Sequence, residues 1–319
     1  MSDLGFVHLH SHTEMSMLDG GARIKDIITK VHGMGQKALA TTDHGNMHVS
    51  PKAHKLAHEI GIKHIVGCEL YVAPWGRKAQ DKKFAKGERS GYHLVCLAKD
   101  HEGYQNLCRL SSLGYTEGFY RRPRVDYDML AEYGKGIIVT SACIGGQIPQ
   151  AILEGDIALA EQQAEWFMKH FGEDFYLELQ NHNIADERLV NTYLRDMAQR
   201  QGIPLTVGID AHYLNKEDAP THDALICIGT GQKIDGERRY KFQGEGYHYM
   251  SEQEVIELFP DDLEAIKNTG RIADKVADQV IKFGDIALPY FDVKQNDTFE
   301  EWKKQGAMNS WNLQSKNSI

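Results

Sequence analysis

The sequence contains no long apolar run, and its N-terminus lacks the apolar core of a secretory signal peptide. Hydrophobic residues make up 41% of the 319 positions, yet no uninterrupted stretch reaches the roughly 18 residues of a membrane-spanning helix. Cysteines are few and odd in number, at positions 68, 96, 108, 143 and 227, which is typical of reduced thiols and not of a disulfide framework. We therefore expect a cytoplasmic protein with no membrane partner.

Positive charge is also scarce, because 36 lysines and arginines stand against 45 aspartates and glutamates and give a net charge of −9. A protein that binds nucleic acid unaided is normally basic, so this balance argues against an autonomous nucleic-acid binder. One local exception is FYRRPRVD at 119–126. Its arginines, Arg121, Arg122 and Arg124, fit phosphate contacts along a DNA backbone, and they fit a surface turn around Pro123 equally well.

Short apolar runs alternate with amphipathic helical patterns over the first 210 residues. The runs that predict strands are 6–10, 37–42, 64–72, 92–98, 136–142, 175–180 and 204–210. The patterns that predict helices are 22–35, a segment opened by Ser50 as N-cap and Pro51 as first helical residue, 101–113 after Asp100, 157–171 after Asp156, and 185–201. Apolar strands alternating with helices predict parallel pairing, and seven such units favour a closed α/β barrel.

The pattern becomes mostly helical after about residue 215. Ser251 and Glu254 form a predicted capping box, and 261–279 reads as another helix. From Leu288 the chain is polar and weakly patterned, which predicts extended or poorly ordered structure. We therefore expect one domain over residues 1–285 and a C-terminal extension or tail over 286–319.

The stretch HLHSH places His8, His10 and His12 at alternate positions, and Asp19 follows. Side chains at i, i+2 and i+4 of a strand lie on the same face of the sheet. Such a face suits a metal site, because histidine is the commonest metal ligand, and it also suits a histidine-rich strand exposed to solvent. This stretch alone leaves both interpretations open.

Further ligand-type residues follow the other predicted strands. They are His44 after the second strand, Glu69 late in the third, Cys143 after the fifth, and Asp210 with His212 after the seventh. The carboxyl ends of the strands of a parallel α/β barrel form one mouth, where active sites lie, so these side chains are expected to converge there. His93 is the exception, because it begins its strand and fits only if that strand enters the site differently.

The set contains more ligands than the four that one tetrahedral zinc takes, and the surplus predicts two or three divalent metal ions. Nitrogen and oxygen ligands suit zinc, manganese or iron, and spacing does not choose among them. Neighbouring metals stabilise both the attacking and the leaving oxygen of a phosphoryl displacement and generate hydroxide at neutral pH. The predicted reaction class is therefore hydrolysis of a phosphoester or pyrophosphate.

Several motifs together resemble the PHP (polymerase and histidinol phosphatase) domain, in the form found in the bacterial DNA polymerase III alpha subunit. They are HLHSHTEMSMLDG, TTDHGN, IVGCELYV, HLVCLAKDHEGYQNL, YRRPRVD, SACIGGQIPQAILEGD and VGIDAHYL, and the resemblance extends over roughly 1–290. THDALICIGTGQ, RRYKFQGEGYHYMS and ALPYF are not expected in a small histidinol phosphatase. They favour the alpha-subunit form.

This resemblance implies a distorted seven-stranded (β/α)7 barrel with a mostly helical C-terminal extension and a trinuclear metal site. The implied ligands are His10, His12, Asp19, His44, Glu69, His93, Cys143, Asp210 and His212, and Asp210, His12 and Asp19 are the predicted catalytic residues. All nine are chemically competent ligands, which favours an active site. His8 is then left over as a hydrogen-bonded core histidine.

The leading functional hypothesis is a metal-dependent phosphoesterase, a 3′–5′ exonuclease that trims DNA ends in proofreading. A metal-binding structural module of a replicative polymerase, without turnover, is one alternative, and a pyrophosphatase or phosphomonoesterase is another. The expected partners are DNA 3′ ends, and a polymerase body with replisome subunits in the parent protein. The chain has no polymerase palm carboxylates, so it is expected to be an excised domain or a free-standing relative that does not polymerise nucleotides.

Other polar residues near the motifs have less specific interpretations. His48, His54 and His58 follow TTDHGN at helical spacing and are expected to form a polar helix face. His182 follows the sixth strand, so it either lines the substrate cleft or has a structural role. Asp43 is placed to orient a ligand from behind.

Overall fold

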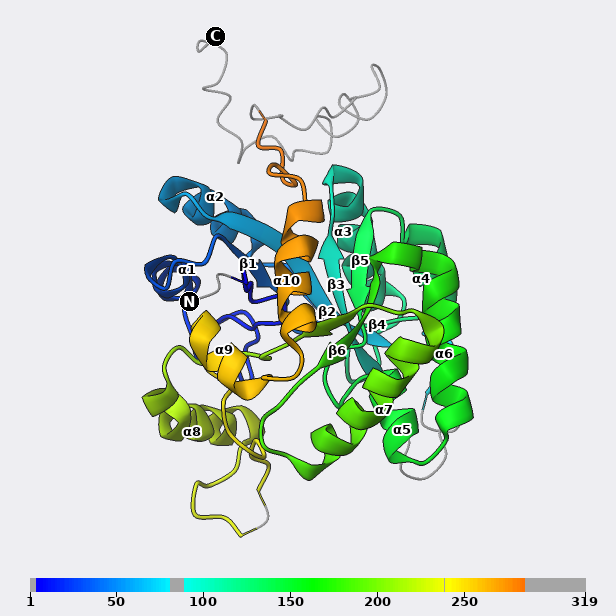
Figure 1. Cartoon of the computed structure of the whole chain (residues 1–319). Helices are drawn as coiled ribbons and strands as arrows, with labels where there is room; N and C mark the ends of the chain where they lie inside the picture. Colours follow the sequence, from blue (N-terminus) through cyan, green and yellow to red (C-terminus); the bar gives the residue numbers. More distant parts are fainter. Residues whose placement is uncertain (1–3, 81–88, 238, 285–319) are drawn as a thin grey trace, which may run out of the picture. The chain divides into compact units, whose positions relative to one another are not determined.

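The computed structural model describes residues 4–80, 89–237 and 239–284. At its centre lies a seven-stranded mixed sheet in the order β1-β2-β3-β5-β6-β7, with β4 paired to β2. The strands are β1 (Ala38–Thr41), β2 (Lys63–Val72), β3 (Tyr92–Ala98), β4 (Arg124–Val125), β5 (Ile137–Thr140), β6 (Phe175–Leu179) and β7 (Leu205–Val207). Helices surround these strands (Figure 1). The α/β barrel-type fold is therefore confirmed, and β4 is the strand that the sequence pattern did not predict.

The direction of β3 differs from the prediction of all-parallel pairing. β3 runs antiparallel to β2, with Glu69 opposite Val95, and antiparallel to β5, with Val95 opposite Thr140. The pairs β1–β2, β5–β6 and β6–β7 are parallel. The first residues of β3 therefore lie at the same end of the sheet as the carboxyl ends of its neighbours.

The predicted first strand, 6–10, forms isolated bridges instead of a regular strand. His8 bridges to Leu39 of β1, and Ser11 bridges to Ala211, which follows β7. The Ala40 amide donates to the His8 carbonyl at 2.8 Å, and the His12 amide donates to the Ala211 carbonyl at 2.8 Å. This segment therefore lies between the two edge strands, β1 and β7, and joins the two edges of the sheet.

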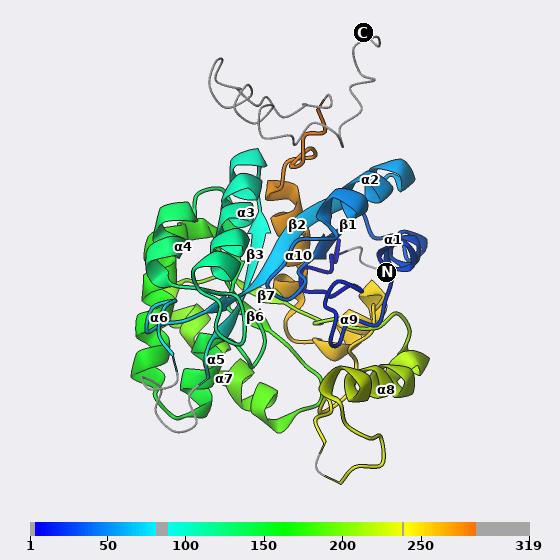
Figure 2. The ribbon, with the colours of Figure 1, turned by 180° about the vertical axis from the view of Figure 1, so that it is seen from behind.

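Seven helices follow or precede these strands in chain order. They are α1 (Ile24–Gly33), α2 (Ser50–Ile60), α3 (His101–Thr116), α4 (Tyr127–Tyr133), α5 (Gln147–Leu153), α6 (Ile157–Phe171) and α7 (Ala185–Gln201). Asp100 and Asp156 cap α3 and α6 as predicted, by accepting from the amides three residues on. The predicted cap of α2 is wrong by one residue, because Val49 occupies the N-cap position and Ser50 is already helical. Figure 2 shows α1 and α2 on one flank of the strands and α3, α4 and α6 on the other.

The regular elements of the described chain after β7 are helices, as expected, but a long irregular segment separates α8 from α9. It forms α8 (Ala219–Thr230), α9 (Glu252–Leu258) and α10 (Leu263–Lys275), and α9 starts with the predicted Ser251–Glu254 capping box. Asn268 of α10 donates to the Leu205 carbonyl of β7 at 2.7 Å, which ties this helix to the sheet.

Residues Met1–Lys282 form one compact unit, separate from Phe283–Ile319. The predicted extension, 286–319, lies outside the described residues, so the boundary at 285 stays a prediction. None of the helices in the described part of the chain combines the length and apolar character needed to cross a membrane.

Candidate metal centre

The nine predicted ligands meet at one end of the sheet. Ligand atoms of seven of them form three overlapping groups, and within each group every atom lies within 4.8 Å of the others. The groups are His12 with His44 and His212, His10 with His12 and Glu69, and Glu69 with His93 and Cys143. Asp19 and Asp210 join them through the contacts described below. The antiparallel direction of β3 explains why His93, at the start of its strand, reaches the same place.

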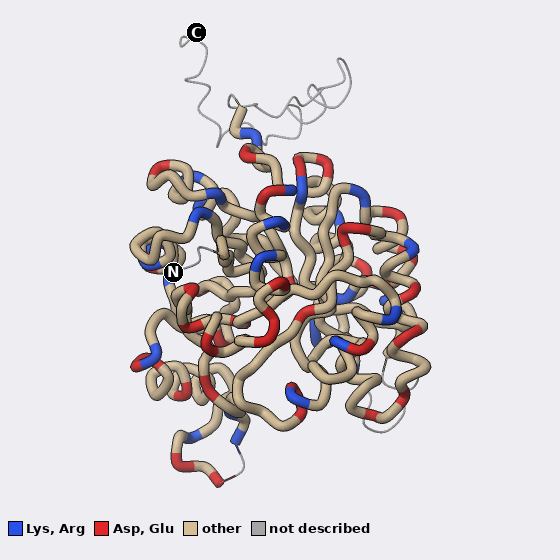
Figure 3. Tube along the Cα trace, viewed as in Figure 1, with Lys and Arg blue, Asp and Glu red and all other residues tan. Residues whose placement is uncertain are grey.

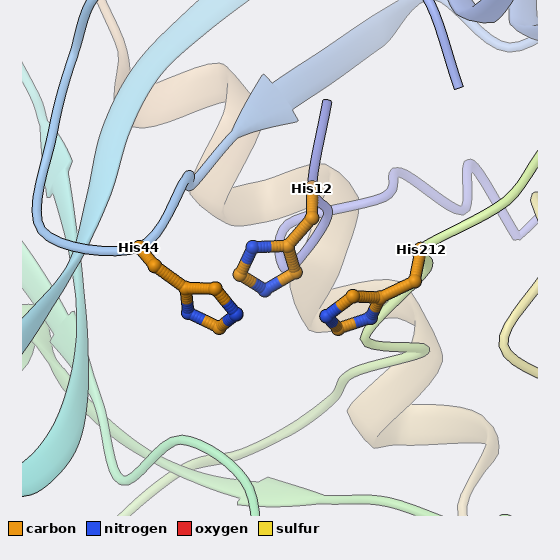
Figure 4. A group of neighbouring side chains, drawn as sticks. All are labelled: His12, His44 and His212. Carbon is orange, nitrogen blue, oxygen red and sulfur yellow. The ribbon is translucent and has the colours of Figure 1, made fainter. Parts of the chain in front are cut away.

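Three imidazoles form the first group, and Figure 4 shows their rings turned toward one another. The His12 ring lies 4.1 Å from that of His44 and 4.2 Å from that of His212, measured between centroids. Asp19 reaches this group, because its Oδ2 lies 3.3 Å from His44 Nε2. Three nitrogen ligands and one oxygen ligand therefore surround one position.

Carboxylates link the groups to one another. Glu69 has no exposed surface, and its Oε1 lies 3.4 Å from His10 Nε2 and 2.6 Å from His93 Nδ1, while Oε2 contacts His44. Asp210 Oδ1 lies 3.3 Å from His10 Nε2 and 3.1 Å from the Nε2 of His12. Each of these two carboxylates therefore faces more than one group.

Cys143 completes the third group. Its Sγ lies 3.4 Å from His93 Nδ1 and accepts a hydrogen bond from the Gly145 amide at 3.3 Å. The residue before it, Ala142, has a φ of 59°, and Asp210 has a φ of 50°. Left-handed backbone is uncommon for such residues and accumulates at functional sites, so both ligand-bearing turns have the character of a functional site.

A buried glutamate that the sequence analysis missed orients His10. Glu178 of β6 accepts from His10 Nδ1 at 2.7 Å, from Gln180 Nε2 at 2.7 Å, and from the Thr140 hydroxyl. Because a carboxylate only accepts, His10 must keep a proton on Nδ1, so Nε2, which faces the cluster, is the nitrogen that would bind a metal. The signal in the sequence is a glutamate at a buried position of the apolar strand FYLEL.

A chain of two hydrogen bonds, through Ser16 to Asp43, orients His12. The Ser16 hydroxyl donates to Asp43 Oδ1 at 2.8 Å, so the Ser16 oxygen accepts from His12 Nδ1 at 2.9 Å. The lone pair of His12 Nε2 therefore faces the cluster. Asp43 thus orients a ligand from behind, as predicted, but it acts on His12 through Ser16 and not on its neighbour in sequence. His212 is held in the same way, because its Nδ1 donates to the Asp210 carbonyl at 2.7 Å.

Several ligand-type atoms in this cluster are buried and have no hydrogen-bond partner among the described residues. They are His10 Nε2, His12 Nε2, His212 Nε2, Asp19 Oδ1, Glu69 Oε1 and Asp210 Oδ1. A buried polar atom without a partner is costly unless a cation or another group satisfies it. These atoms face one another and combine nitrogen and oxygen, which is the donor set that divalent transition metals prefer. The residues therefore fit bound metal ions.

The charges of the cluster depend on one another. Burial opposes ionisation of Glu69 and Asp210, but neighbouring imidazoles outweigh it and hold the pKa of both carboxyls well below the usual range. Burial also opposes protonation of His10 and His44, yet Asp210 and Glu178 raise the pKa of His10, and Glu69 raises that of His44. Burial lowers the pKa of His12 to about 3. Without metal, protons on His10 and His44 therefore balance part of the negative charge.

A cavity of about 440 Å³ opens onto the cluster. Asp19, His44, His93, Cys143, Asp210 and His212 line its wall. Arg89, Arg122 and Lys241 supply positive charge there, and Tyr240, Phe242 and Tyr247 supply aromatic rings. The centre is therefore open to a ligand of the size of a nucleotide.

The burial of His8 and of the histidines near α2 tests two further predictions. His8 lies in the core, where its Nε2 donates to the Met250 carbonyl at 3.0 Å, as predicted. His48 and His58 are exposed on or near α2, but His54 is buried and its ring packs against that of His64, so the predicted polar face is wrong for His54.

His182 does not line the cavity. Its two ring nitrogens donate to the Glu187 carboxylate at 2.6 Å and to the Ile209 carbonyl at 2.8 Å. Its ring stacks on that of Tyr247, with 3.8 Å between the ring centroids. Its role is therefore structural.

The three arginines of 119–126 have different environments. Arg124 is buried and donates to the backbone carbonyls of Gly118 and Ala79, so it is not available to a DNA backbone. Arg122 is exposed and lies on the cavity wall. Figure 3 shows lysines and arginines interspersed with acidic residues over the viewed side, which agrees with the absence of a broadly basic surface.

Metal should protect Cys143 from alkylation. Burial, together with the charges of Asp210 and Glu69, raises the pKa of its thiol, and a bound cation would reverse that shift and hold the sulfur as a thiolate ligand. The metal-free thiol is mostly protonated even at about pH 9, but its thiolate fraction is consumed irreversibly, so prolonged iodoacetamide treatment should label Cys143 in chelated protein and spare it in metal-loaded protein, as measured by peptide mass spectrometry. Cys108, also partly exposed and remote from the cluster, is the control and should label equally in both. Equal labelling of Cys143 would remove it from the ligand set.

A model of the PHP domain family matches residues 8–182. Three curated relatives carry the name DNA polymerase III subunit alpha. The protein from Borreliella burgdorferi is 45% identical over 292 residues, which are 90% of this chain and 25% of that protein. Those from Deinococcus radiodurans and Treponema pallidum are 39% and 38% identical, over 84% and 94% of this chain and 21% and 26% of theirs. The chain therefore spans about a quarter of the length of these relatives.

Proposed function

This chain belongs to the PHP domain family, and from that premise we propose that it is a metal-dependent phosphoesterase, more specifically a 3′–5′ exonuclease that removes nucleotides from DNA ends. The observation that carries the proposal is the set of buried, unpaired ligand atoms on six of the nine converging residues, directly beneath an open cavity. A barrel without metal would leave these polar atoms unsatisfied, and the cavity above them gives a substrate access to the bound ions.

The proposed roles follow from the contacts of each residue. His12, His44, His212 and Asp19 hold one metal, and Glu69 with His93 and Cys143 holds another. His10 and Asp210 complete a third position next to His12 and Glu69. Zinc, manganese or iron bound there supplies Lewis acidity and hydroxide at neutral pH.

The chain's own residues fix the geometry and the protonation of this centre. Glu178 and Ser16 keep the lone pairs of His10 and His12 directed at the cluster. Glu69 and Asp210 stay ionised at neutral pH, because their pKa values are held low by the imidazoles. Asp210, His12 and Asp19 are therefore the residues on which we expect hydrolysis to depend most.

The name of the relatives extends the proposal to partners and location. As the matching part of a DNA polymerase III subunit alpha, the chain would act on DNA 3′ ends beside a polymerase body and replisome subunits in the cytoplasm. Proofreading is the role that such a position suggests.

Hydrolysis by purified chain tests the proposal. Chelated protein reloaded with manganese or zinc should release mononucleotides from the 3′ end of a 5′-labelled single strand at pH 7.5 to 8, measured on a sequencing gel. The rate should fall as the pH drops toward 5, because protons compete with metal for His10 and His44.

Two outcomes would replace the exonuclease. A fully metallated sample that spares single-stranded, duplex and mismatched ends but cleaves pyrophosphate or an aryl phosphate would be a pyrophosphatase or phosphomonoesterase. A sample that cleaves none of these, yet loses thermal stability when its metal is removed, would be a structural module.

A further inference from the structure

The segment 239–250, here called the aromatic strap, runs between α8 and α9 along the cavity. Tyr240, Lys241, Phe242, Gln243 and Tyr247 of this strap all line the cavity wall. The strap is held at both ends. Arg239 makes a two-pronged ion pair with Asp223 at 2.5 Å, and the Tyr247 carbonyl accepts from the His212 amide at 2.8 Å. Its rings are therefore fixed beside the cluster.

The exposure of the rings of the aromatic strap increases from Phe242 to Tyr240. Phe242 is half-buried, and its ring meets those of His212, His222 and Tyr247 edge to face at 4.8 to 4.9 Å between centroids. The Tyr240 ring lies 6.2 Å from the Phe242 ring, measured between centroids, and 57% of the surface of Tyr240 is exposed. The inner ring thus packs against a predicted metal ligand, and the outer ring presents a free face at the mouth of the cavity.

Arg89, Arg122 and Lys241 bring positive charge to the same cavity, whose wall also carries the carboxylates Asp19, Asp186, Glu187 and Asp210. Within the described parts of the chain, no carboxylate forms an ion pair with Arg89, Arg122 or Lys241. The guanidinium of Arg122 lies 5.5 Å from the centre of the Tyr71 ring, and that ring packs edge to face on His93. In a chain of net charge −9, cations beside a predicted phosphoesterase centre that form no ion pair within the described residues suit an anionic ligand.

From this arrangement we propose that Tyr240 and Phe242 form a stacking subsite for the terminal base of an unpaired nucleic-acid strand, whose phosphates are held by Arg122 and Lys241. An aromatic face beside a cationic track is the general means by which proteins bind single strands without reading sequence. The inference rests on the proposed function for the identity of the reaction and adds the residues that select a nucleotide end over a small phosphate.

A fluorescent base tests the stacking directly. The probe is a single strand with 2-aminopurine at its 3′ end, joined by a phosphorothioate that resists cleavage, and it is added to the full-length, metal-loaded chain. Stacking quenches 2-aminopurine, so the native protein should quench it. Tyr240→Ala should lose most of the quenching and bind about 5- to 100-fold more weakly, whereas Tyr240→Phe should retain both. Tyr193→Ala on α7, an exposed tyrosine outside the cavity, is the matched control and should behave as native.

A thermodynamic cycle separates stacking from a merely structural role of Tyr240. A second probe ends in an abasic nucleotide, and the affinities of both probes for native protein and Tyr240→Ala are measured by fluorescence anisotropy. If the Tyr240 ring stacks on the base, Tyr240→Ala should weaken binding of the base-bearing probe strongly and binding of the abasic probe only slightly. The losses of binding free energy from removing the ring and from removing the base are then not additive. Additive losses would overturn the subsite, and so would equal affinity of the native protein for both probes.

The same measurements distinguish the subsite from the reaction. Quenching and a coupled cycle, with no hydrolysis of an ordinary strand, would leave the subsite intact and refute the exonuclease. Hydrolysis of an ordinary strand at native rates by Tyr240→Ala, together with unchanged quenching, would refute the subsite and leave the exonuclease intact.

Discussion

Replacement of Asp210 by asparagine is expected to lower nucleotide release at least about a thousandfold, equivalent to about 4 kcal/mol of transition-state stabilisation. Asp210 Oδ1 is buried, makes no hydrogen bond within the described residues, and lies close to both His10 Nε2 and His12 Nε2. An amide in its place removes the negative charge on which two of the proposed metal positions depend and presents a weaker ligand to them. Because the carboxylate acts at the centre of the cluster, the loss should appear mainly in kcat.

The backbone should tolerate this change. Asp210 has a φ of 50°, a left-handed conformation that asparagine adopts as readily as aspartate. The amide has nearly the same shape, so circular dichroism should match that of the native protein. Alanine at this position would confuse the test, since it is less suited to left-handed backbone.

The control is Asp261→Asn, which changes an exposed aspartate just before α10 and should leave the rate unchanged. Activity is measured on a labelled strand, and metal content is measured by elemental analysis. If Asp210→Asn hydrolyses DNA at the native rate with unchanged metal content, the reaction takes place elsewhere.

Part of this centre could be predicted because several of its candidate ligands follow strands that are visible as apolar runs, and the resemblance to the PHP domain supplied the full set of nine. The sequence also identified His93 as the exception, since it begins a strand while His44, Cys143, Asp210 and His212 follow theirs. The alternation of strands and helices predicts parallel pairing and so gave the wrong direction for β3. Strand direction depends on a connection whose path is not encoded in the local pattern, and only the structure reveals that a reversed strand brings His93 to the same mouth.

The supporting residues were harder to predict because they act across long distances in the sequence. Glu178 lies 168 positions from His10, and nothing near either residue indicates that they pair. Arg124 stands beside Arg121 and Arg122 in one basic segment, yet its side chain is buried and satisfied by backbone carbonyls. Burial, which decides these roles, is a property of the assembled fold, and composition alone cannot separate them.

Removal of metal is expected to lower the melting temperature by about 20 °C at neutral pH. Each metal site adds about 4 kcal/mol to the free energy of unfolding when the free metal concentration is about a thousand times its Kd. The melting temperature of a chain of this size shifts by about 2 °C per kcal/mol, so two to three sites account for about 20 °C. The reason in this structure is the group of buried atoms on His10, His12, His212, Asp19, Glu69 and Asp210 that make no hydrogen bond within the described residues and that a bound cation would satisfy.

The difference in melting temperature between loaded and metal-free protein should also widen as the pH rises from 6.5 to 8. In the metal-free chain the pKa values of His10 and His44 are raised, so their contribution to stability is complete below pH 6.5 and is lost as the pH rises through those raised values. The lowered carboxyl pKa values of Glu69 and Asp210 contribute constantly over this range. Loaded protein has already given up the two histidine protons.

Two protons released on metal binding correspond to about 4 kcal/mol over these 1.5 pH units, or about 8 °C at about 2 °C per kcal/mol. Buried histidines outside the cluster, such as His8 and His64, affect both forms alike and cancel in the difference. Differential scanning calorimetry with and without chelator, at matched free metal, measures the gap at each pH.

Two variants identify the source of the widening. His44→Gln removes one of the two protons and should reduce the slope of the gap against pH by about half. His48→Gln changes an exposed histidine four positions away and should keep the native slope. A gap that is constant with pH in native protein would show that His10 and His44 carry no proton in the metal-free chain. A melting temperature unaffected by chelator would show that the converging side chains hold no metal.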